Sequence, residues 1–310
     1  MIRQIRTEDF DRLIGCWNDS APFDPVSAGL FYEKVAEDSG YRSQFGLLDQ
    51  EDGLVLGFVV GVVRSGGTKA GGKVAEGFLK FLAVRSEYRG SGIGSSLLDE
   101  IESALVKSGV DRIRLGESAP NYLTPGVDVR YAQAIRFFER HGYRVIGETY
   151  NLDVSLHYEL GSVQFDTNAE NADLIARGFQ IRRAGRRDED AVYALLAEHW
   201  PSWSDEVART FRNVPISLHI AVRSGSVVAF SAYDGNNIGT GWFGPMGTDP
   251  AFRGLGLGSV LLKRCLSDIS DQGHRRAIIP WVEPVGFYYR AAGATIARIF
   301  VRMEKEKISV

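Results

Sequence analysis

Two stretches of the chain place an arginine and a run of glycines just before a helical pattern. The first, YRGSGIGSSLL, covers residues 88–98, and the second, FRGLGLGSVLL, covers residues 252–262. Each follows a strand-like segment and leads into leucines at three- and four-residue steps, which indicate an amphipathic helix. A turn of this kind leaves backbone N–H groups unpaired at the positive end of the helix dipole. Both stretches therefore suit a phosphate or pyrophosphate, and the arginine adds a positive charge beside it.

The context of these glycines argues against two common nucleotide-binding motifs. A dinucleotide fingerprint normally follows the first strand of its domain, whereas both turns here follow the third or fourth strand-like segment. The segment GGTKAGGKV (66–74) has a lysine at P-loop spacing, but it ends in Val74 instead of Ser or Thr and joins two strands. We expect this segment to be a hairpin loop.

Three blocks recur in the same order along the chain, which indicates two copies of one domain. Residues 179–200 resemble 1–17, the second turn resembles the first, and 285–298 resemble 134–147. Each copy predicts an α/β fold, a mixed sheet with helices on its faces. We expect an N-terminal domain at 1–160, a linker region at 161–178 and a C-terminal domain at 179–310.

The two copies differ in one loop. Arg89 and Gly142 are 53 positions apart, whereas Arg253 and Gly293 are only 40 apart. The extra residues fall in a loop with Pro and Gly at 117–131. Because loops carried on a scaffold often determine binding specificity, we expect the two copies to have different functions.

Composition narrows the class of protein. The chain has 310 residues, 44% of them hydrophobic and 24% charged, which is typical of soluble globular domains. The net charge of −3 and the absence of a strongly basic half argue against a nucleic-acid binder. No apolar run approaches the roughly 20 residues of a membrane span, and no signal-peptide pattern opens the chain. Cys16 and Cys265 are expected to be reduced and buried, without a metal site.

These residues and their order resemble the GNAT (GCN5-related) N-acetyltransferase family, twice over nearly the whole chain. In both copies Arg-x-x-Gly-x-Gly lies between a strand and a helix, and a later helix ends in Gly-Tyr or Gly-Ala. The resemblance implies two tandem GNAT-like domains, each a central splayed mixed sheet flanked by helices, with acetyl-CoA bound in the split.

The resemblance also assigns roles to the residues around each turn. The backbone at the strand ends would pair with the pantetheine arm of CoA: Leu82, Ala83 and Val84, and Met246, Gly247 and Thr248. The turns would hold the pyrophosphate: Arg89, Gly90, Ser91, Gly92, Ile93, Gly94 and Ser95, and Arg253, Gly254, Leu255, Gly256, Leu257, Gly258 and Ser259. Because both turns keep the full pattern, we expect each domain to bind CoA.

Acetyl transfer to an amine requires a neutral amine and a proton for the departing thiolate. Many members of the family supply that proton from a tyrosine four residues before the glycine that ends the last helix. Counting back from Gly293 gives Tyr289, whereas counting back from Gly142 gives Phe138, which has no proton to donate. The C-terminal domain is therefore expected to be catalytic, with Phe138 packed in the core of the other domain.

The catalytic base is less clear from sequence. A carboxylate at a strand end beside the split could relay a proton through water, and Glu283 holds such a position in the C-terminal copy. Glu76 and Glu117 are the corresponding candidates in the first copy. A solvated strand end is the favoured alternative for each of the three.

Aromatic residues near the two splits are candidates for contacts with the acceptor. Trp242 and Trp281 fall on the strands that would flank the second split, and Tyr122 falls in the long loop of the first copy. Packing in the core is the alternative, and it is favoured for Trp281.

The function expected from these observations is acetyl-CoA-dependent N-acetylation of a primary amine on a small molecule, by direct attack, in the C-terminal domain. Two alternatives remain open: a non-catalytic acyl-CoA sensor, or catalysis in the N-terminal domain with Tyr122 or Tyr131 as the acid. The expected location is cytoplasmic, without nucleic-acid or membrane partners. Homo-oligomerisation is left open.

Overall fold

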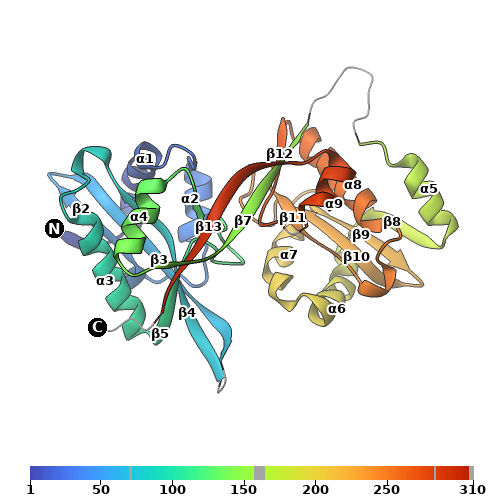
Figure 1. Ribbon diagram of the computed structural model, residues 1–310. Coiled ribbons are helices and arrows are strands. Elements are labelled where there is room, and N and C mark those ends of the chain that lie inside the picture. Colours follow the sequence, from blue (N-terminus) through green and yellow to red (C-terminus); the bar gives the residue numbers. More distant parts are fainter. Residues whose placement is uncertain (70–71, 157–164, 283, 307–310) are drawn as a thin grey trace. The chain divides into compact units, whose positions relative to one another are not determined.

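The computed structural model describes residues 1–69, 72–156, 165–282 and 284–306 (Figure 1). The chain forms two compact units, one of Met1–Thr149 with Phe300–Val310 and one of Tyr150–Ile299. The expected linker region is 161–178; its described part, 165–178, falls within the second unit, and residues 168–176 form a helix. In the described residues no helix is long and apolar enough to cross a membrane.

The first unit is built on a mixed sheet in the order β1-β2-β3-β4-β5. Neighbouring strands are antiparallel, except β4 and β5, which are parallel. The C-terminal part of β13 pairs with β5 and with the short β6, and the first half of β7 also belongs to this unit. The strands are β1 (Ile2–Gln4), β2 (Gly46–Glu51), β3 (Leu54–Lys69), β4 (Gly72–Val84), β5 (Val110–Leu115), β6 (Val127–Asp128), β7 (Arg144–Ser155) and β13 (Thr295–Glu306).

Helices cover both faces of this sheet because successive side chains of its strands alternate between two cores. Phe58 points into a core with α1 and α2, and its neighbour Val59 points into a core with α3 and α4. Cys16 is a buried free thiol in the first of these cores, as expected. The helices are α1 (Phe10–Ser20), α2 (Ala28–Val35), α3 (Ile93–Lys107) and α4 (Ala132–Arg140).

The second unit repeats this order of elements. Its antiparallel sheet runs β11-β10-β9-β8, and one parallel bridge, from Trp242 to Ile278, connects it to β12. The second half of β7 pairs with β12. The strands are β8 (Phe179–Arg183), β9 (Leu218–Arg223), β10 (Ser226–Tyr233), β11 (Phe243–Thr248) and β12 (Arg276–Ile279). The helices are α5 (Asn168–Ala176), α6 (Glu189–His199), α7 (Ser204–Thr210), α8 (Leu257–Asp271) and α9 (Val285–Ala292).

Short 3₁₀ turns occur in both units, and those before α1, α3, α6 and α8 lie at matching places. They comprise Thr7–Asp9, Ser43–Phe45, Ser86–Tyr88, Arg186–Asp188, Pro201–Trp203 and Pro250–Phe252. The predicted fold class, two mixed-sheet domains with helices on the faces of each sheet, is confirmed.

An arginine–aspartate pair lies at the start of each of the two sequence repeats. Arg3 donates two hydrogen bonds to Asp9, each 2.7 Å long, and Arg182 donates two to Asp188, 2.6 and 2.7 Å long. Each aspartate also accepts a hydrogen bond from a backbone N–H three residues before it. The repeat therefore extends to individual side chains.

Candidate functional site

The two glycine turns have the same backbone conformation. Gly90 and Gly254 have φ of +79° and +77°, and Gly92 and Gly256, just before α3 and α8, have φ of +92° and +91°. These left-handed values strongly favour glycine. A Cβ at any of the four would meet no atom within 4 Å, so the surface of each turn is open. That surface carries the first N–H groups of a helix, which is where an anion binds.

The arginine of each turn folds back onto the preceding strand. Nε of Arg89 donates to the carbonyl oxygen of Val84 at 3.0 Å, and Nε of Arg253 donates to that of Thr248 at 3.2 Å. Both carbonyls belong to the last residue of the strand. The arginine therefore fixes the junction between strand and turn while its charge stays beside the turn.

The third glycine of each turn serves packing. A Cβ on Gly94 would lie 3.4 Å from the ring of Phe137 on α4, and one on Gly258 would lie 3.4 Å from the ring of Phe287 on α9. Both glycines are helical and lack the positive φ of the first two. They let α3 and α8 approach the aromatic helix that closes the same side of the sheet.

A cavity opens in the first unit where β4 and β5 separate. The last pair between these strands is Leu79 with Leu115, so β4 continues beyond the end of β5. The cavity has a volume of about 920 Å³, which is in the range of sites for small molecules and cofactors. It is lined by the strand end and turn already assigned to CoA, including Leu82, Ala83, Val84, Arg89, Gly90, Gly92, Gly94 and Ser95.

The far wall of this cavity is polar and aromatic. Asp24 and Asp128 line it and are both buried. Asp128 accepts hydrogen bonds from Nε and Nη2 of Arg130, at 2.9 and 2.7 Å, and that guanidinium lies 4.0 Å from the centre of the Phe23 ring. The hydroxyl of Tyr131 accepts a hydrogen bond from the backbone N–H of Phe23 at 3.0 Å. These contacts tie the segment after α1 to the segment before α4 around the cavity.

In the second unit an indole occupies the space beside the strand end. Ala21 and Trp200 are equivalent, because each follows the first long helix of its unit and donates its N–H to the carbonyl four residues earlier, at 2.7 Å. Ala21 lines the cavity of the first unit. A Cβ on Gly247 of β11 would lie only 2.7 Å from the Trp200 ring. The large side chain therefore fills space that the small one leaves open.

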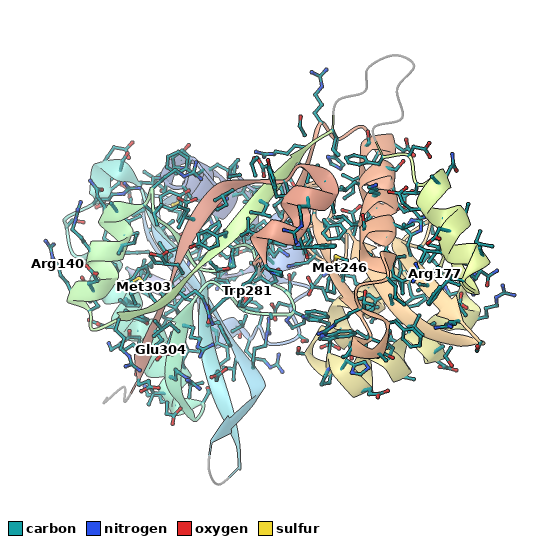
Figure 2. The ribbon with its side chains drawn as sticks, turned by 45° about the vertical axis from the view of Figure 1, so that its right-hand side comes forward. Arg140, Arg177, Met246, Trp281, Met303 and Glu304 are labelled. Carbon is teal, nitrogen blue, oxygen red and sulfur yellow. The ribbon has the colours of Figure 1, made fainter. Side chains whose placement is uncertain are left out.

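The second turn also faces a helix. Leu255, Gly256 and Ser259 line a cavity of about 480 Å³ together with residues of α5, among them Glu170 and Asp173. Arg177, labelled in Figure 2, donates to the carbonyl of Leu255 at 3.3 Å. Glu170 is paired with Lys263 and Asp173 with Arg177, so α5 acts at this turn by limiting the space, which is about half that at the first turn, and not by its charge.

The predicted acid, Tyr289, is 63% exposed on α9. The neighbouring Tyr288 is the residue equivalent to Phe138, because Phe287 and Phe137 make the same contact with the third glycine. Helix α9 runs up to the residue before Gly293, whereas α4 ends two residues before Gly142. Counting back from the glycine and matching the aromatic contact therefore select two neighbouring residues of α9, Tyr289 and Tyr288. Tyr289 remains a prediction.

The buried position of Tyr288 keeps its hydroxyl protonated and neutral. Its ring packs edge-on against Phe243 at 6.3 Å between ring centroids. Burial raises the pKa of Tyr288 to about 12. Phe138, its counterpart, is buried in the core of the first unit and also borders the cavity.

The candidate bases differ in their surroundings. Glu283 lies outside the described residues. Glu76 pairs with Arg112, and Glu117 is buried and accepts hydrogen bonds from Arg114 at 3.0 Å and Arg302 at 2.6 Å. Carboxylates held in this way are suited to fixing structure.

The candidate acceptor residues do not gather at one site. Trp242 is 4% exposed and forms the parallel bridge to Ile278. Trp281, labelled in Figure 2, has a φ of +50° and donates its backbone N–H to Asn151 at 3.1 Å. Tyr122 is buried, and the lining of the 920 Å³ cavity within the described part of the chain does not include it.

Sequence reasoning missed Asp24, Asp128 and Lys80 as residues of the cavity. No local motif marks them, since each reaches the cavity from a different part of the first unit. Tyr131, which had been an alternative acid, does line the cavity. Within the described ranges, no group of three or more His, Cys, Asp or Glu could hold a metal ion.

Two family models match the chain. An acetyltransferase (GNAT) domain model covers residues 42–145, and an acetyltransferase (GNAT) family model covers residues 189–293. A search of curated protein sequences finds no match. The two models fall on the two units, and each includes one glycine turn.

Several solved structures share the fold over nearly the whole chain. The GCN5-related glucosamine N-acetyltransferase region of a fungal multi-domain GH3 β-N-acetylglucosaminidase is similar over 98% of this chain, with a TM-score of 0.80 and 19% identity. This chain covers only 38% of that longer protein. A GCN5-related N-acetyltransferase from Sphaerobacter thermophilus matches with a TM-score of 0.70 and 17% identity, covering 100% of this chain and 96% of that one.

A further similar structure has the same tandem organisation. A tandem GNAT protein from the clavulanic acid biosynthesis pathway matches with a TM-score of 0.61 and 15% identity, over 100% of this chain and 99% of that one. At identities of 15–19%, these comparisons show a shared fold and no more.

Proposed function

Because the chain belongs to the GNAT acetyltransferase family, we propose that it transfers the acetyl group of acetyl-CoA to the primary amine of a small molecule. We further propose that the cavity of the first unit holds both substrates. The observation that carries this proposal is the continuity of that cavity, which runs from the open glycine turn and strand end to a wall that contains Asp24 and Asp128.

The residues of the first unit can supply what the transfer requires. The turn and Arg89 would bind the pyrophosphate, and the end of β4 would align the arm that carries the thioester. An amine that arrives as its cation must lose a proton to water before its nitrogen attacks the thioester carbon, and the nitrogen loses a second proton to water as the amide forms. The C–N bond forms as the C–S bond breaks, and the sulfur takes up a proton. Tyr131 is the proposed donor of that proton, since Phe138 has none to give.

An amine acceptor is also supported by similarity. The fungal region with the same fold is described as a glucosamine N-acetyltransferase. The aromatic and acidic residues of the cavity wall, Trp17, Phe23, Asp24 and Tyr131, are suited to a small polar amine of that general kind.

Catalysis in the second unit is the second candidate. The observation that favours it is Tyr288, whose raised pKa of about 12 leaves a proton available at neutral pH. Trp200 beside Gly247, and helix α5 beside the turn, leave less space for CoA there. The sequence alone predicts two CoA sites per chain, whereas these surroundings favour one, in the first unit.

The experiment that tests the function is release of free thiol from acetyl-CoA in the presence of a panel of small primary amines. An acetyltransferase releases thiol in proportion to the acetylated amine, which mass spectrometry identifies. Binding of acetyl-CoA without thiol release for any amine would support the alternative of an acyl-CoA sensor.

A further inference from the structure

Lys80 lies at a β-bulge, at the point where β4 leaves β5. Val60 of β3 faces Phe81, and the next residue, Gly61, faces Leu79, so Lys80 has no opposing residue on β3. A bulge releases the extra residue from the ladder and redirects the strand. The whole residue is 7% exposed but its side chain only 1%, so the main chain of Lys80 is the part that reaches the cavity.

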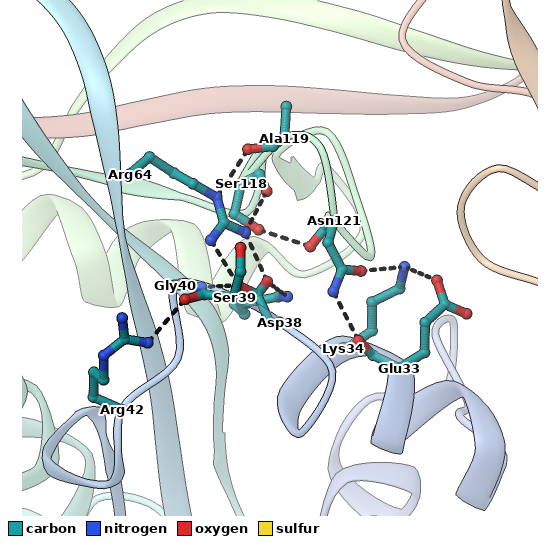
Figure 3. A network of polar contacts seen from close by, with 11 residues as sticks. Glu33, Lys34, Asp38, Ser39, Gly40, Arg42, Arg64, Ser118, Ala119 and Asn121 are labelled. Carbon is teal, nitrogen blue, oxygen red and sulfur yellow. Dashed lines mark hydrogen bonds and ion pairs between the residues drawn. The ribbon is translucent and has the colours of Figure 1, made fainter. Parts of the chain in front are cut away.

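The side chain of Lys80 points away from the cavity into a buried ionic cluster. Its Nζ donates to Oδ2 of Asp38, the residue that follows α2 by three positions. Arg64 of β3 donates to both oxygens of the same carboxylate, each at 2.6 Å. One carboxylate thus connects the bulge of β4 to the neighbouring strand. Figure 3 shows its contact with Arg64.

The cluster also holds the long loop that is specific to the first unit. Arg64 donates to the backbone carbonyls of Ser118 and Ala119, at 3.0 and 2.9 Å. Asn121 accepts from Lys34 at 2.9 Å and donates to the carbonyl of Glu33 at 2.7 Å (Figure 3). Beyond these residues, Thr124 and Gly126 of the same loop line the cavity.

In the second unit, the pairing of β10 with β11 also shifts at the corresponding place, between Met246 and Phe243, but a different residue stands there. Counting back four residues from the last residue of the strand gives Lys80 in β4 and Gly244 in β11. A glycine cannot make the ion pair. The cluster therefore belongs to the unit that has the open cavity.

The bulge lies where the acyl end of CoA would reach. From Val84 at the turn to Lys80 there are four residues of strand, which is about 13 Å at the usual rise of a β-strand. A CoA arm that starts at the glycine turn and follows the strand end therefore brings its thioester toward Lys80. This placement rests on the proposed function.

We propose that Lys80 is a positioning residue: its ion pair with Asp38 holds the bulge of β4, and through Arg64 the loop after β5, in the geometry that the acyl-bearing arm of CoA requires. Lys80 acts here through its backbone and its partners, and its ammonium group does not contact the substrate.

The electrostatics of the cluster make this role sensitive to pH. Burial lowers the pKa of Lys80 to about 7, against the attraction of Asp38. Burial acts to raise the pKa of Asp38, but the hydrogen bonds and charges of Arg64 and Lys80 outweigh it and lower that pKa to about 2. The other charged groups beside Lys80 are Lys34 and Glu33 of α2. As the pH rises through about 7, Lys80 loses its charge and Asp38 keeps its own.

The test compares two ligands by calorimetry. Acetyl-CoA has the arm, whereas the terminal methyl ester of 3′-phosphoadenosine 5′-diphosphate has the phosphates of CoA, with the same charge, but no arm. Groups that titrate near the phosphates affect both ligands in the same way. The affinity for acetyl-CoA divided by that for the arm-free ligand therefore reports how strongly the arm is bound. We expect that ratio to fall by up to about tenfold per pH unit above pH 7 in the wild type, the limit for one proton.

Three variants sharpen the test. Lys80→Met should give a low ratio at every pH, and Lys80→Arg, whose charge does not titrate in this range, should give a ratio that does not change with pH. Lys34→Met is the matched control, because Lys34 is an equally buried lysine that contacts the loop but not the bulge. It should keep a pH-dependent ratio, with the fall moved to higher pH because the charge of Lys34 no longer lowers the pKa of Lys80.

A wild-type ratio that is constant with pH would overturn the proposal, as would a Lys80→Met variant with the wild-type profile. Loss of the profile in Lys34→Met would assign the effect to the loop and also overturn it. Failure of both ligands to bind the wild type would instead contradict the proposed function.

Discussion

The hydroxyl of Tyr131 accepts a hydrogen bond from the backbone N–H of Phe23, at 3.0 Å, on the wall of the cavity in the first unit. The hydrogen bond orients the phenol, and a hydroxyl that accepts in this way can still donate its own proton. This geometry supports the proposal that Tyr131 protonates the departing thiolate in that cavity.

Replacement of Tyr131 by phenylalanine should lower turnover by roughly 10²–10⁴-fold, the usual share of general acid–base catalysis. Affinity for acetyl-CoA should stay the same, because the lost group acts as charge develops on sulfur. Steady-state kinetics with an acetylated amine, together with calorimetry, checks both parts. Tyr288→Phe is the control from the second unit and should keep wild-type turnover. The reverse result would move the acid to Tyr288.

The number of acetyl-CoA molecules bound per chain is expected to be one. The first turn opens into the cavity, whereas the second faces Glu170 and Asp173, and Trp200 fills the space beside its strand. Isothermal titration calorimetry measures this number directly. Two equivalent sites would show that α5 and Trp200 leave the second split accessible.

Phe138 is expected to be structural. It is 7% exposed, and Phe138→Ala should lower the free energy of unfolding by about 3–5 kcal/mol, the range for loss of a buried aromatic ring. Tyr289→Ala is the matched control, since that ring is 63% exposed and its loss should change stability little. Chemical denaturation of both variants checks the difference. Equal stabilities would show that the Phe138 ring contributes little to the core.

Acid should destabilise each unit through one aspartate, Asp9 in the first unit and Asp188 in the second. Hydrogen bonds from Arg3 and Arg182 lower the pKa values of Asp9 and Asp188 to about 2, from an ordinary value of 3.8. Because these pKa values are lower in the folded state, the stabilisation is fully present above pH 4 and is lost as the pH falls toward 2. Denaturation midpoints measured across that range should fall more steeply for the wild type than for Asp9→Asn or Asp188→Asn. Parallel curves would contradict this assignment.

The parts of the fold that depend on local sequence were predictable. The glycine turns follow from Arg-x-x-Gly-x-Gly between a strand and an amphipathic helix, and left-handed φ at Gly92 and Gly256 leaves little alternative to glycine. The repeat of three blocks gave the two domains. The helix formed by 168–176 was missed, because its short polar sequence has a weak period.

The residues around the turns could not be read from sequence because they depend on contacts between distant segments. Ala21 and Trp200 matter only through the strand that each faces, and Lys80 matters only through Asp38, 42 positions away. The choice between Tyr288 and Tyr289 depends on where α9 ends, and one residue of helix turns a side chain by about 100°. Sequence spacing alone does not determine a helix end to that accuracy.

The central claim is that acetyl transfer takes place in the first unit. The most direct measurement is thiol release from acetyl-CoA, with an amine from the panel, by the variants Gly92→Val and Gly256→Val. Both substitutions impose the same strain, since φ is +92° and +91° at the two positions. We predict that Gly92→Val abolishes turnover and that Gly256→Val retains it. Loss of turnover in Gly256→Val, with turnover kept in Gly92→Val, would contradict the account and place the reaction in the second unit.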